Sequence, residues 1–210
     1  MNVRARPLPC RMGKLIFDGM TTPDDPVRLK GKILIAMPGM GDPRFDKSVV
    51  FICDHSEAGA MGLIVNKTAP DLSLGELLDQ LSINGDRFDT AQTVHFGGPV
   101  ETNRGFVLHS PDYYRKGSTL RVNALASMTA SLEVLQDTAE GAGPKSFFLA
   151  LGYSGWGGGQ LEDEIGQNGW LTGEASDEIL FSRENEGKWT QALKGMGVDP
   201  LLLSAAAGHA

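Results

Sequence analysis

The sequence has very few cysteines and no long hydrophobic run. Its only cysteines, Cys10 and Cys53, lie far apart and in no CxxC spacing, which excludes a disulfide framework and a compact thiolate metal site. The longest apolar pieces, such as residues 32–37 and 146–151, fall well short of the ~18 residues that a membrane helix needs. The basic N-terminus lacks the apolar stretch of a signal peptide. We therefore expect a cytoplasmic protein without a membrane span.

Basic residues are also in the minority. The chain has 19 Lys plus Arg against 26 Asp plus Glu, a formal net charge of −7. Residues 1–28 hold five bases and three acids, so residues 29–210 carry 14 − 23 = −9. Nucleic-acid binding depends on Lys and Arg that displace counterions from phosphates. The charge therefore disfavours direct binding to DNA or RNA.

Glycine, in contrast, is abundant: the 27 glycines are nearly twice the usual share of ~7%. A chain of 210 residues with 41% hydrophobic residues is long enough for one domain with its own apolar core. Four of the eleven prolines lie in residues 1–28, which show little apolar periodicity. We expect a loosely ordered extension over residues 1–28 and a single domain over residues 29–210.

Apolar runs and helix signals alternate irregularly along this domain. Strands are predicted at residues 32–37, 48–54, 61–66, 93–96, 105–109, 120–122, 146–151 and 178–181. Helices are predicted from residue 73, where Ser73 and Glu76 form a capping box, over residues 125–135, 160–168 and 189–196, and from residue 199. The second and third strands are close enough for an antiparallel hairpin. The order indicates an α+β fold with a mixed sheet.

The glycine-rich segment 152–159 follows a predicted buried strand. A dinucleotide-binding G-x-G-x-x-G motif would need glycine at Gln160, and the G-K-[ST] ending of a P-loop is absent. A nucleophile elbow would place Ser154 as nucleophile, but Trp156 stands where the closing glycine is required. Two interpretations stay open: the glycines contact a ligand, or they permit unusual backbone angles while Tyr153 and Trp156 pack.

Cys53 and His55 lie two residues apart on a predicted strand and so face the same side. Their side chains would be about 6 to 7 Å apart, beyond direct hydrogen-bond reach. We expect a buried, unreactive Cys53 and an exposed His55 at the strand end.

Three histidines and two carboxylates are candidate metal ligands. His55, His95 and His109 could meet Asp54 or Glu101 at a metal, but their spacing matches no compact ligand motif, and we expect hydrogen-bonded structural histidines.

The remaining charged candidates each have a structural alternative. Glu162 and Glu164 are expected to cap a short helix. Arg104 is the best candidate for binding an anion, and an ion pair with Glu101 is the alternative.

Taken together, these segments resemble the AlgH/YqgE family of bacterial proteins, whose biochemical function is unassigned. The residues that carry the resemblance are Leu34–Pro38, Asp42-Pro43, Ser48–Val50, Ile52–His55, Gly59–Gly62, Asn66-Lys67, Gly97–Pro99, Arg104–Phe106, Leu108-His109, Leu151–Tyr153, Trp156, Gly159–Glu162, Glu164-Ile165, Trp170-Leu171 and Gly208–Ala210. The resemblance covers residues 29–210. It implies an α/β fold with a bent or barrel-like mixed sheet flanked by helices, and a label as transcriptional regulator. Because residues 29–210 carry a net charge of −9, any role in transcription is expected to be indirect, without direct binding to DNA.

The leading hypothesis is a cytoplasmic, non-enzymatic binding protein without a cofactor, which engages an unknown protein or small-molecule partner. The candidate binding residues fall at predicted strand ends and loops, where function concentrates on a rigid scaffold. They are Met37, Pro38, Asp42, Pro43, His55, Asn66, Gly97, Gly98, Pro99, Arg104, His109, Trp156, Gln160 and Glu162. The first alternative is an enzyme with His55 or His109 as general base and Arg104 as anion holder. The second is a direct transcriptional regulator.

Overall fold

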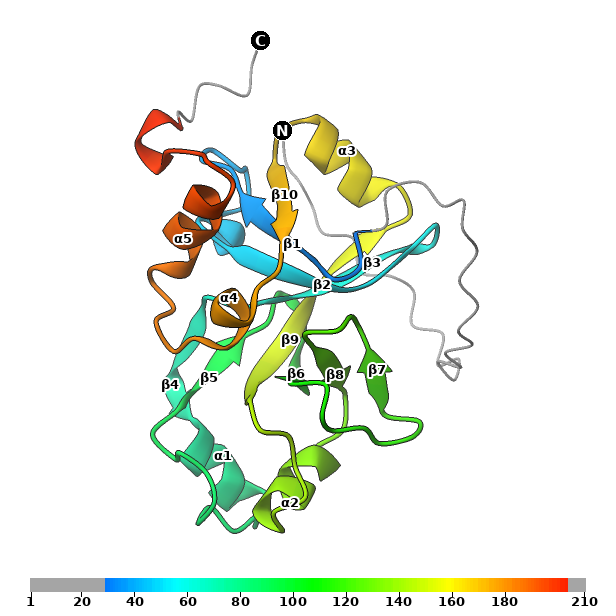
Figure 1. Ribbon diagram of the computed structural model, residues 1–210, viewed down its shortest axis with the longest axis vertical. Coiled ribbons are helices and arrows are strands. Elements are labelled where there is room, and N and C mark those ends of the chain that lie inside the picture. Colours follow the sequence, from blue (N-terminus) through cyan, green and yellow to red (C-terminus); the bar gives the residue numbers. More distant parts are fainter. Residues whose placement is uncertain (1–28, 204–210) are drawn as a thin grey trace.

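The computed structural model describes residues 29–203 (Figure 1). The expected extension over residues 1–28 lies outside the described residues. The strands are β1 (Lys32–Ala36), β2 (Val49–Ser56), β3 (Gly59–Ile64), β4 (Thr68–Ser73), β5 (Thr93–Phe96), β6 (Val100–His109), β7 (Thr119–Arg121), β8 (Ser127–Thr129), β9 (Phe147–Gly157) and β10 (Trp170–Glu174). The α-helices are α1 (Leu74–Gln80), α2 (Glu133–Ala139), α3 (Gln160–Gly166), α4 (Asp177–Phe181) and α5 (Lys188–Gly195), with 3-10 turns at Pro43–Phe45 and Pro200–Leu202. Within the described residues, none of these helices has the length and apolar character to cross a membrane.

The strands form one curled, mixed sheet in a single domain, which confirms the predicted α+β fold. The main path runs β10-β1-β2-β3-β9-β6-β8-β7 with antiparallel neighbours. Beside this path, β5 pairs with β9 in parallel and β4 pairs with β5. The predicted hairpin is present as β2 and β3, and a register shift marks a bulge between Ile52 and Asp54.

Strand β9 joins the two halves of the sheet (Figure 1). Its first part pairs with β5 and β6, and its last part pairs with β3. The backbones approach so closely there that a Cβ atom on Gly98 would lie 2.3 Å from the carbonyl carbon of Tyr153, and one on Gly152 would lie 2.4 Å from the Gly98 oxygen. Glycines are therefore needed where these backbones cross. The glycine-rich segment 152–159, which follows the predicted strand 146–151, is itself strand as far as Gly157.

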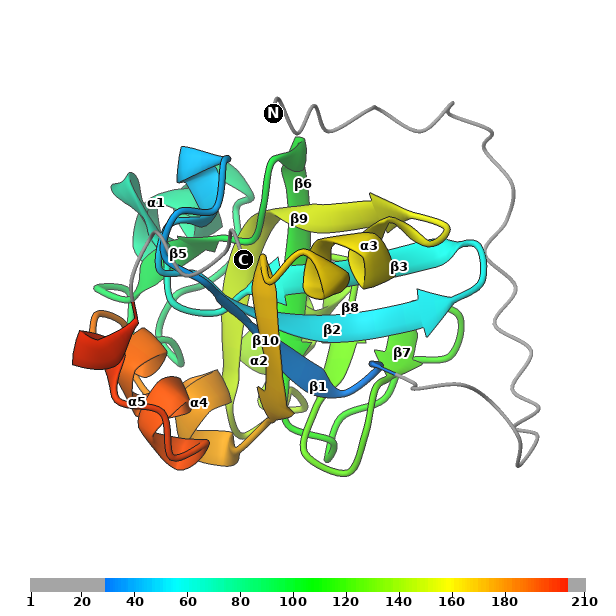
Figure 2. The same cartoon turned by 90° about the horizontal axis from the view of Figure 1, so that it is seen from above.

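Both faces of the sheet are covered, because alternate residues of the central strands point to opposite sides. Ile33 and Ile35 pack under α4 and α5, whereas Leu34 packs under α3. Figure 2 shows α3 lying over β2 and β3. A third apolar cluster fixes α1 and α2 to the far half of the sheet through Leu78 and Leu135.

Two element predictions were wrong and two strands were missed. Residues 125–135 do not form one helix, because Ser127–Thr129 pairs with β6 and β7 as β8 and the helix begins only at Glu133. The predicted strand at 178–181 is helix α4, whose first turn is capped by the Ser176 hydroxyl. Strands β4 and β10 were not predicted. The capping box of Ser73 and Glu76 at α1 is confirmed.

Candidate functional site

Several candidate residues gather at the β1–β2 loop. Met37, Pro38, Asp42 and Pro43 lie in this loop, and Asn66, just after β3, holds it in place. The Asn66 side chain accepts a hydrogen bond from Val49 N at 2.7 Å and donates one to Lys47 O at 2.8 Å. Lys47 has a left-handed φ of 49°. Such a conformation is uncommon for residues other than glycine, so the Asn66 contact stabilises an unusual loop shape.

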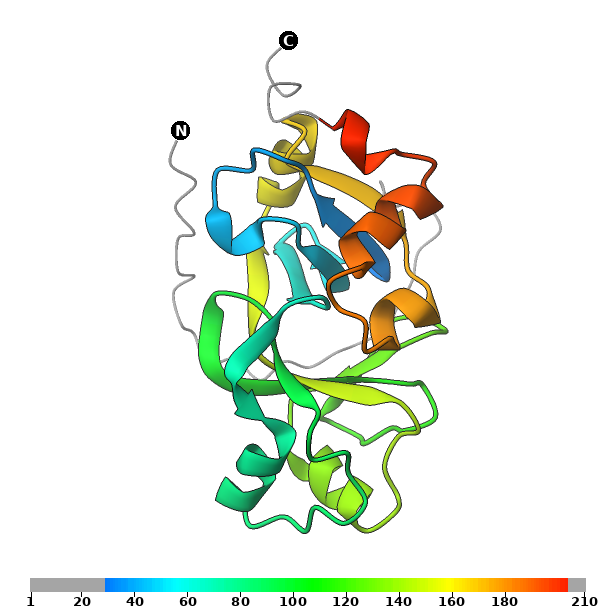
Figure 3. The same cartoon turned by 90° about the vertical axis from the view of Figure 1, so that its left-hand side faces the viewer.

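The same loop is joined to the β5–β6 connection. The Arg44 guanidinium binds the Asp42 carboxylate at 2.6 Å and lowers the pKa of that carboxyl. Lys67 Nζ donates to Arg44 O at 2.8 Å, while its backbone oxygen accepts from Phe96 N. Figure 3 shows the loop and the β5–β6 connection on the same side of the molecule. Residues 37–48, Asn66, Lys67 and Pro99 are called the loop surface below. Gly97 and Gly98 are buried next to it.

His55, Trp156, Gln160 and Glu162 lie elsewhere, at α3. His55 Nε2 lies 2.7 Å from Glu162 Oε1, and Nδ1 accepts a hydrogen bond from Leu29 N at 3.3 Å. Because Nδ1 is an acceptor, the proton is on Nε2, and the ring donates to the carboxylate. The His55 side chain is only 10% exposed. The prediction of an exposed His55 was therefore wrong; the residue links α3 to the start of the described chain.

Glu164 fixes α3 to the sheet. Its Oε2 accepts from the indole N–H groups of Trp156 and Trp170, both at 2.9 Å, and its Oε1 accepts from Gln160 Nε2 at 2.9 Å. Neither Glu162 nor Glu164 caps the helix, whose N-cap lacks a side-chain hydrogen bond. The prediction of helix-capping carboxylates was wrong, because both groups bind side chains of other elements.

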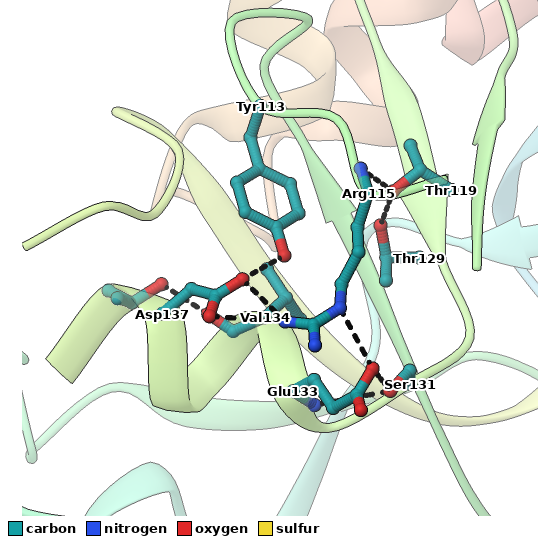
Figure 4. Close-up of polar contacts among 9 residues, drawn as sticks. Tyr113, Arg115, Thr119, Thr129, Ser131, Glu133, Val134 and Asp137 are labelled. Atoms are coloured by element: carbon teal, nitrogen blue, oxygen red, sulfur yellow. Dashed lines mark hydrogen bonds and ion pairs between the residues drawn. The ribbon is translucent and has the colours of Figure 1, made fainter. Parts of the chain in front are cut away.

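His109 is fully buried at the end of β6 and heads a chain of hydrogen bonds. Its Nδ1 donates to Ser110 O at 2.8 Å, and its Nε2 lies 2.9 Å from Thr129 Oγ1. Thr129 Oγ1 is 2.8 Å from Thr119 Oγ1, which accepts from Arg115 N (Figure 4). In a neutral His109 the proton is on Nδ1, so Nε2 is an acceptor. The Thr129 hydroxyl therefore donates to Nε2, and the Thr119 hydroxyl donates to Thr129 Oγ1. Burial lowers the pKa of His109 and favours this neutral form.

The chain of hydrogen bonds from His109 ends at Arg115, whose side chain lies against α2. Figure 4 shows the Arg115 guanidinium between the carboxylates of Glu133 and Asp137, each at 3.0 Å. Tyr113 donates to Asp137 Oδ2 at 2.6 Å. These contacts tie the β6–β7 loop to α2.

The structure does not bring the proposed catalytic residues together. Arg104 lies five residues from His109 along β6, roughly 16 Å at the usual strand rise. It pairs with Glu101 at 3.0 Å, as the alternative prediction had it. His55 lies on β2 against α3.

Neither candidate nucleophile is accessible. Cys53 is buried, as predicted, and burial raises the pKa of its thiol. Ser154 is also buried, and its hydroxyl donates to Gly97 O at 3.3 Å. A nucleophile must reach its substrate, so the described chain does not support chemistry at these two residues.

A pocket that the sequence did not predict lies between strand β5 and the α4–α5 connection. Its volume is about 270 Å³. It is called the His95 pocket below and is lined by Asp89, Ala91, Gln92, Thr93, His95, Phe147, Phe148, Phe181, Ser182, Arg183 and Asn185. His95 is 5% exposed, and its Nε2 lies 3.3 Å from Asn185 Oδ1. Its Nδ1 is buried without a hydrogen-bond partner among the described residues.

Lys188 lies beside this pocket and is fully buried. Its ammonium donates to the backbone oxygens of Val65 at 2.9 Å and Leu180 at 3.4 Å. Burial lowers the pKa of Lys188 to about 8. Burial, together with the Lys188 charge, lowers the pKa of His95 to about 4. His95 is therefore neutral at physiological pH.

Metal binding would need ligands that converge. Among residues 29–203, no three His, Cys, Asp or Glu side chains come together in a way that could hold a metal ion. His55, His95 and His109 each have hydrogen-bond partners of their own.

Known proteins resemble this chain over most of its length. A family model described as AlgH-like matches residues 33–201. A UPF0301 protein of Ruegeria pomeroyi is 58% identical over 183 residues, which cover 87% of this chain and 99% of the relative. The solution structure of the AlgH protein from Pseudomonas aeruginosa is 41% identical with a TM-score of 0.71, and the match covers 90% of this chain and 100% of that one. A crystal structure from Corynebacterium diphtheriae, 19% identical with a TM-score of 0.67 over 87% of this chain and 92% of that one, shares the fold.

Proposed function

This chain belongs to the AlgH-like family, and we propose that it is a non-enzymatic binding protein that engages a protein partner through the loop surface. The observation that carries the proposal is how the loop surface is built. Hydrogen bonds from Asn66 and Lys67 hold an exposed loop in one shape. A loop that is ordered before binding loses less conformational entropy when a partner docks.

The charges of the loop surface favour a partner with acidic groups. Its three bases, Arg44, Lys47 and Lys67, outnumber its two acids, Asp42 and Asp46, so the loop surface carries 3 − 2 = +1 in a chain whose residues from 29 onward carry −9. Opposite charges at an interface increase the association rate and fix the orientation of the partner. A regulatory role would then be indirect, through that partner, because the acidic body disfavours direct binding to DNA. We place this activity in the cytoplasm.

The reactive side chains support a non-enzymatic role. Burial keeps the Cys53 thiol and the Ser154 hydroxyl from any substrate, and the His109 imidazole is saturated by Ser110 and Thr129. A general base needs access to the proton that it removes. None of these three groups has that access.

Site-specific photo-crosslinking in cell extract tests the proposal. A photoreactive residue at Lys47 is expected to give one discrete product, whereas the same residue at Lys194, an exposed lysine of α5, gives none. Lys47→Glu is expected to abolish binding of the identified partner, and Lys194→Glu, the same charge change away from the surface, is expected to leave it unchanged. Equal products at both positions would contradict the proposal. So would turnover of a metabolite that is lost when His109 is replaced in a folded protein.

A further inference from the structure

Strand β10 forms one edge of the sheet, and its outer side pairs with no strand among the described residues. Met37 N donates to Gly169 O at 3.0 Å, and the β1–β10 register continues from that pair. Backbone groups of an antiparallel strand point alternately to its two sides, so those of Gly173 point to β1 and those of Thr172 point outward. An exposed row of backbone donors and acceptors is a template for a further strand.

A groove of about 670 Å³ lies beside this edge, between the last residues of β10 and helices α4 and α5 (Figure 2). Its floor is apolar and includes the buried side chains of Ile33, Ile179 and Ala192. Met196 also lines the groove and is 39% exposed. A Cβ atom on Gly173 would lie 3.2 Å from Met196 Sδ, so the methionine covers the face of the glycine. A side chain from a strand placed next to Gly173 would bury the exposed part of Met196.

The rim of the groove is acidic. Glu174 on β10 and Glu178 on α4 are both exposed, and Lys32 is the one base among the described residues that line the groove. Lys32 pairs with Glu174, whereas Glu178 has no ion-pair partner within the described part of the chain. The rim therefore carries 1 − 2 = −1 and favours an occupant with a positive charge.

The chain itself contains a segment of this kind. Leu29, the first described residue, lines the groove, so residues 1–28 join the domain at this place. These residues carry 5 − 3 = +2, and their one run of three large apolar residues, 15–17, directly follows Lys14. The eleven residues 18–28 span about 36 Å when extended, roughly twice the length of the five-residue β10. The connection is therefore long enough to reach any part of β10.

We propose that residues 14–17 of the same chain add a strand to the free edge of β10, antiparallel to it. Leu15 lies beside Gly173 in this arrangement, on the face of the sheet that α5 covers, and contacts Met196 in the groove. Side chains of adjacent strands meet in this way on one face of a sheet. The site is separate from the loop surface and does not depend on the proposed protein partner.

The same register uses the other two features of the edge. Lys14 lies beside Glu174, as a cross-strand pair of opposite charge. Ile16 lies beside Thr172, whose outward backbone groups exchange two hydrogen bonds with it. Extended peptides add to exposed sheet edges through main-chain bonds of this kind, and side-chain contacts at alternate positions provide the specificity.

Amide hydrogen exchange at Thr172, measured by NMR on the full chain, tests the pairing. Exchange is expected to be at least tenfold slower in the unaltered chain than in Ile16→Pro, because proline removes a donor from the pair. Thr21→Pro is the matched control, since it makes the same kind of change outside residues 14–17, and it is expected to stay within twofold of the unaltered chain. A nuclear Overhauser effect between the methyl groups of Leu15 and Met196 is also expected.

A second pair of variants tests the charge. Lys14→Glu is expected to speed exchange at Thr172 about threefold, because it places two acids side by side, whereas Arg6→Glu, the same reversal elsewhere in residues 1–28, leaves the rate unchanged.

Several results would overturn the proposal. They are fast exchange at Thr172 in the unaltered chain, equal rates in the two proline variants, equal rates in the two charge variants, and the lack of a Leu15–Met196 effect. Exchange that speeds up when the protein is diluted would also overturn it, because the strand would then come from a second copy of the chain.

Discussion

Thr129 is the central link of the hydrogen-bond chain at His109, and its replacement gives the sharpest test of that chain. Thr129 is fully buried, and its Oγ1 bridges Thr119 Oγ1 at 2.8 Å and His109 Nε2 at 2.9 Å. Thr129→Val keeps the volume and removes the hydroxyl. The Nε2 acceptor and the Thr119 hydroxyl both lose their partner in the interior, at about 1–3 kcal/mol each, so we expect a loss of roughly 2–6 kcal/mol.

Thr129→Ser is the matched control, because it keeps the hydroxyl and loses only a methyl group. Its cost is about 1 kcal/mol from lost apolar burial. Packing alone predicts the opposite order, since serine leaves a cavity and valine does not. The two variants therefore separate hydrogen bonding from packing by the sign of their difference.

Urea denaturation at neutral pH measures both variants, with the m-value checked for constancy. Thr102→Val on the exposed part of β6 is the surface control and is expected to change the unfolding free energy by less than about 0.5 kcal/mol. If Thr129→Ser is less stable than Thr129→Val, or if Thr129→Val matches the surface control, the hydrogen-bond chain does not stabilise the fold and our assignment of its direction fails.

Three further predictions concern His95, the glycines and Cys53. The pKa of His95 is about 4 in the folded protein, below its ordinary value of 6.5, so as pH falls the unfolded chain takes up the proton first. The neutral His95 therefore contributes fully to the free energy of unfolding above about pH 6.5, and this contribution is lost as pH falls toward 4. That loss amounts to roughly 3 kcal/mol, and His95→Phe should flatten the corresponding part of a urea-midpoint against pH curve; an unchanged curve would refute the assignment. Gly98→Ala should unfold the protein or lower the free energy of unfolding by several kcal/mol, because the new Cβ would lie 2.3 Å from the backbone of Tyr153. Gly159→Ala, with φ 75° and open space around it, should lower that free energy by only about 1 kcal/mol. Thermal denaturation measures both variants, and similar losses would contradict the close backbone approach at Gly98. Iodoacetamide should leave the Cys53 peptide unmodified in the native protein and modify it in urea, since burial raises the pKa of the thiol; native labelling seen by mass spectrometry would refute this.

Local signals predicted the elements whose stability is local. The capping box at α1 acts over four residues, and both partners are present in the structure. The spacing of Leu125, Met128, Leu132 and Leu135 suits a helix, but residues 127–129 gain strand partners on both sides, at β6 and β7. Pairing with distant strands overrode a helical periodicity that the chain displays over only part of its length.

Part of the α3 network was accessible from sequence, because Gln160 and Glu164 stand four residues apart on one helix face. What the sequence did not show is that Trp156 and Trp170, from strands on either side of this helix, both direct their indole N–H groups to one Glu164 oxygen. A glutamate that accepts three hydrogen bonds is occupied. Distinctive residues around α3 thus have a structural explanation that does not require a ligand.

The His95 pocket was missed for a different physical reason. His95 and Asn185 are separated by 90 residues, and Lys188 and Val65 by 123. No local pattern distinguishes a lysine that starts a short amphipathic helix from one that will be buried against two carbonyl groups. The burial arises only when α4 and α5 close over the sheet next to β5, and the same closure leaves His95 Nδ1 without a partner. A pocket formed by elements so distant in the chain depends on the topology of the sheet, which is why it becomes visible only in the folded protein.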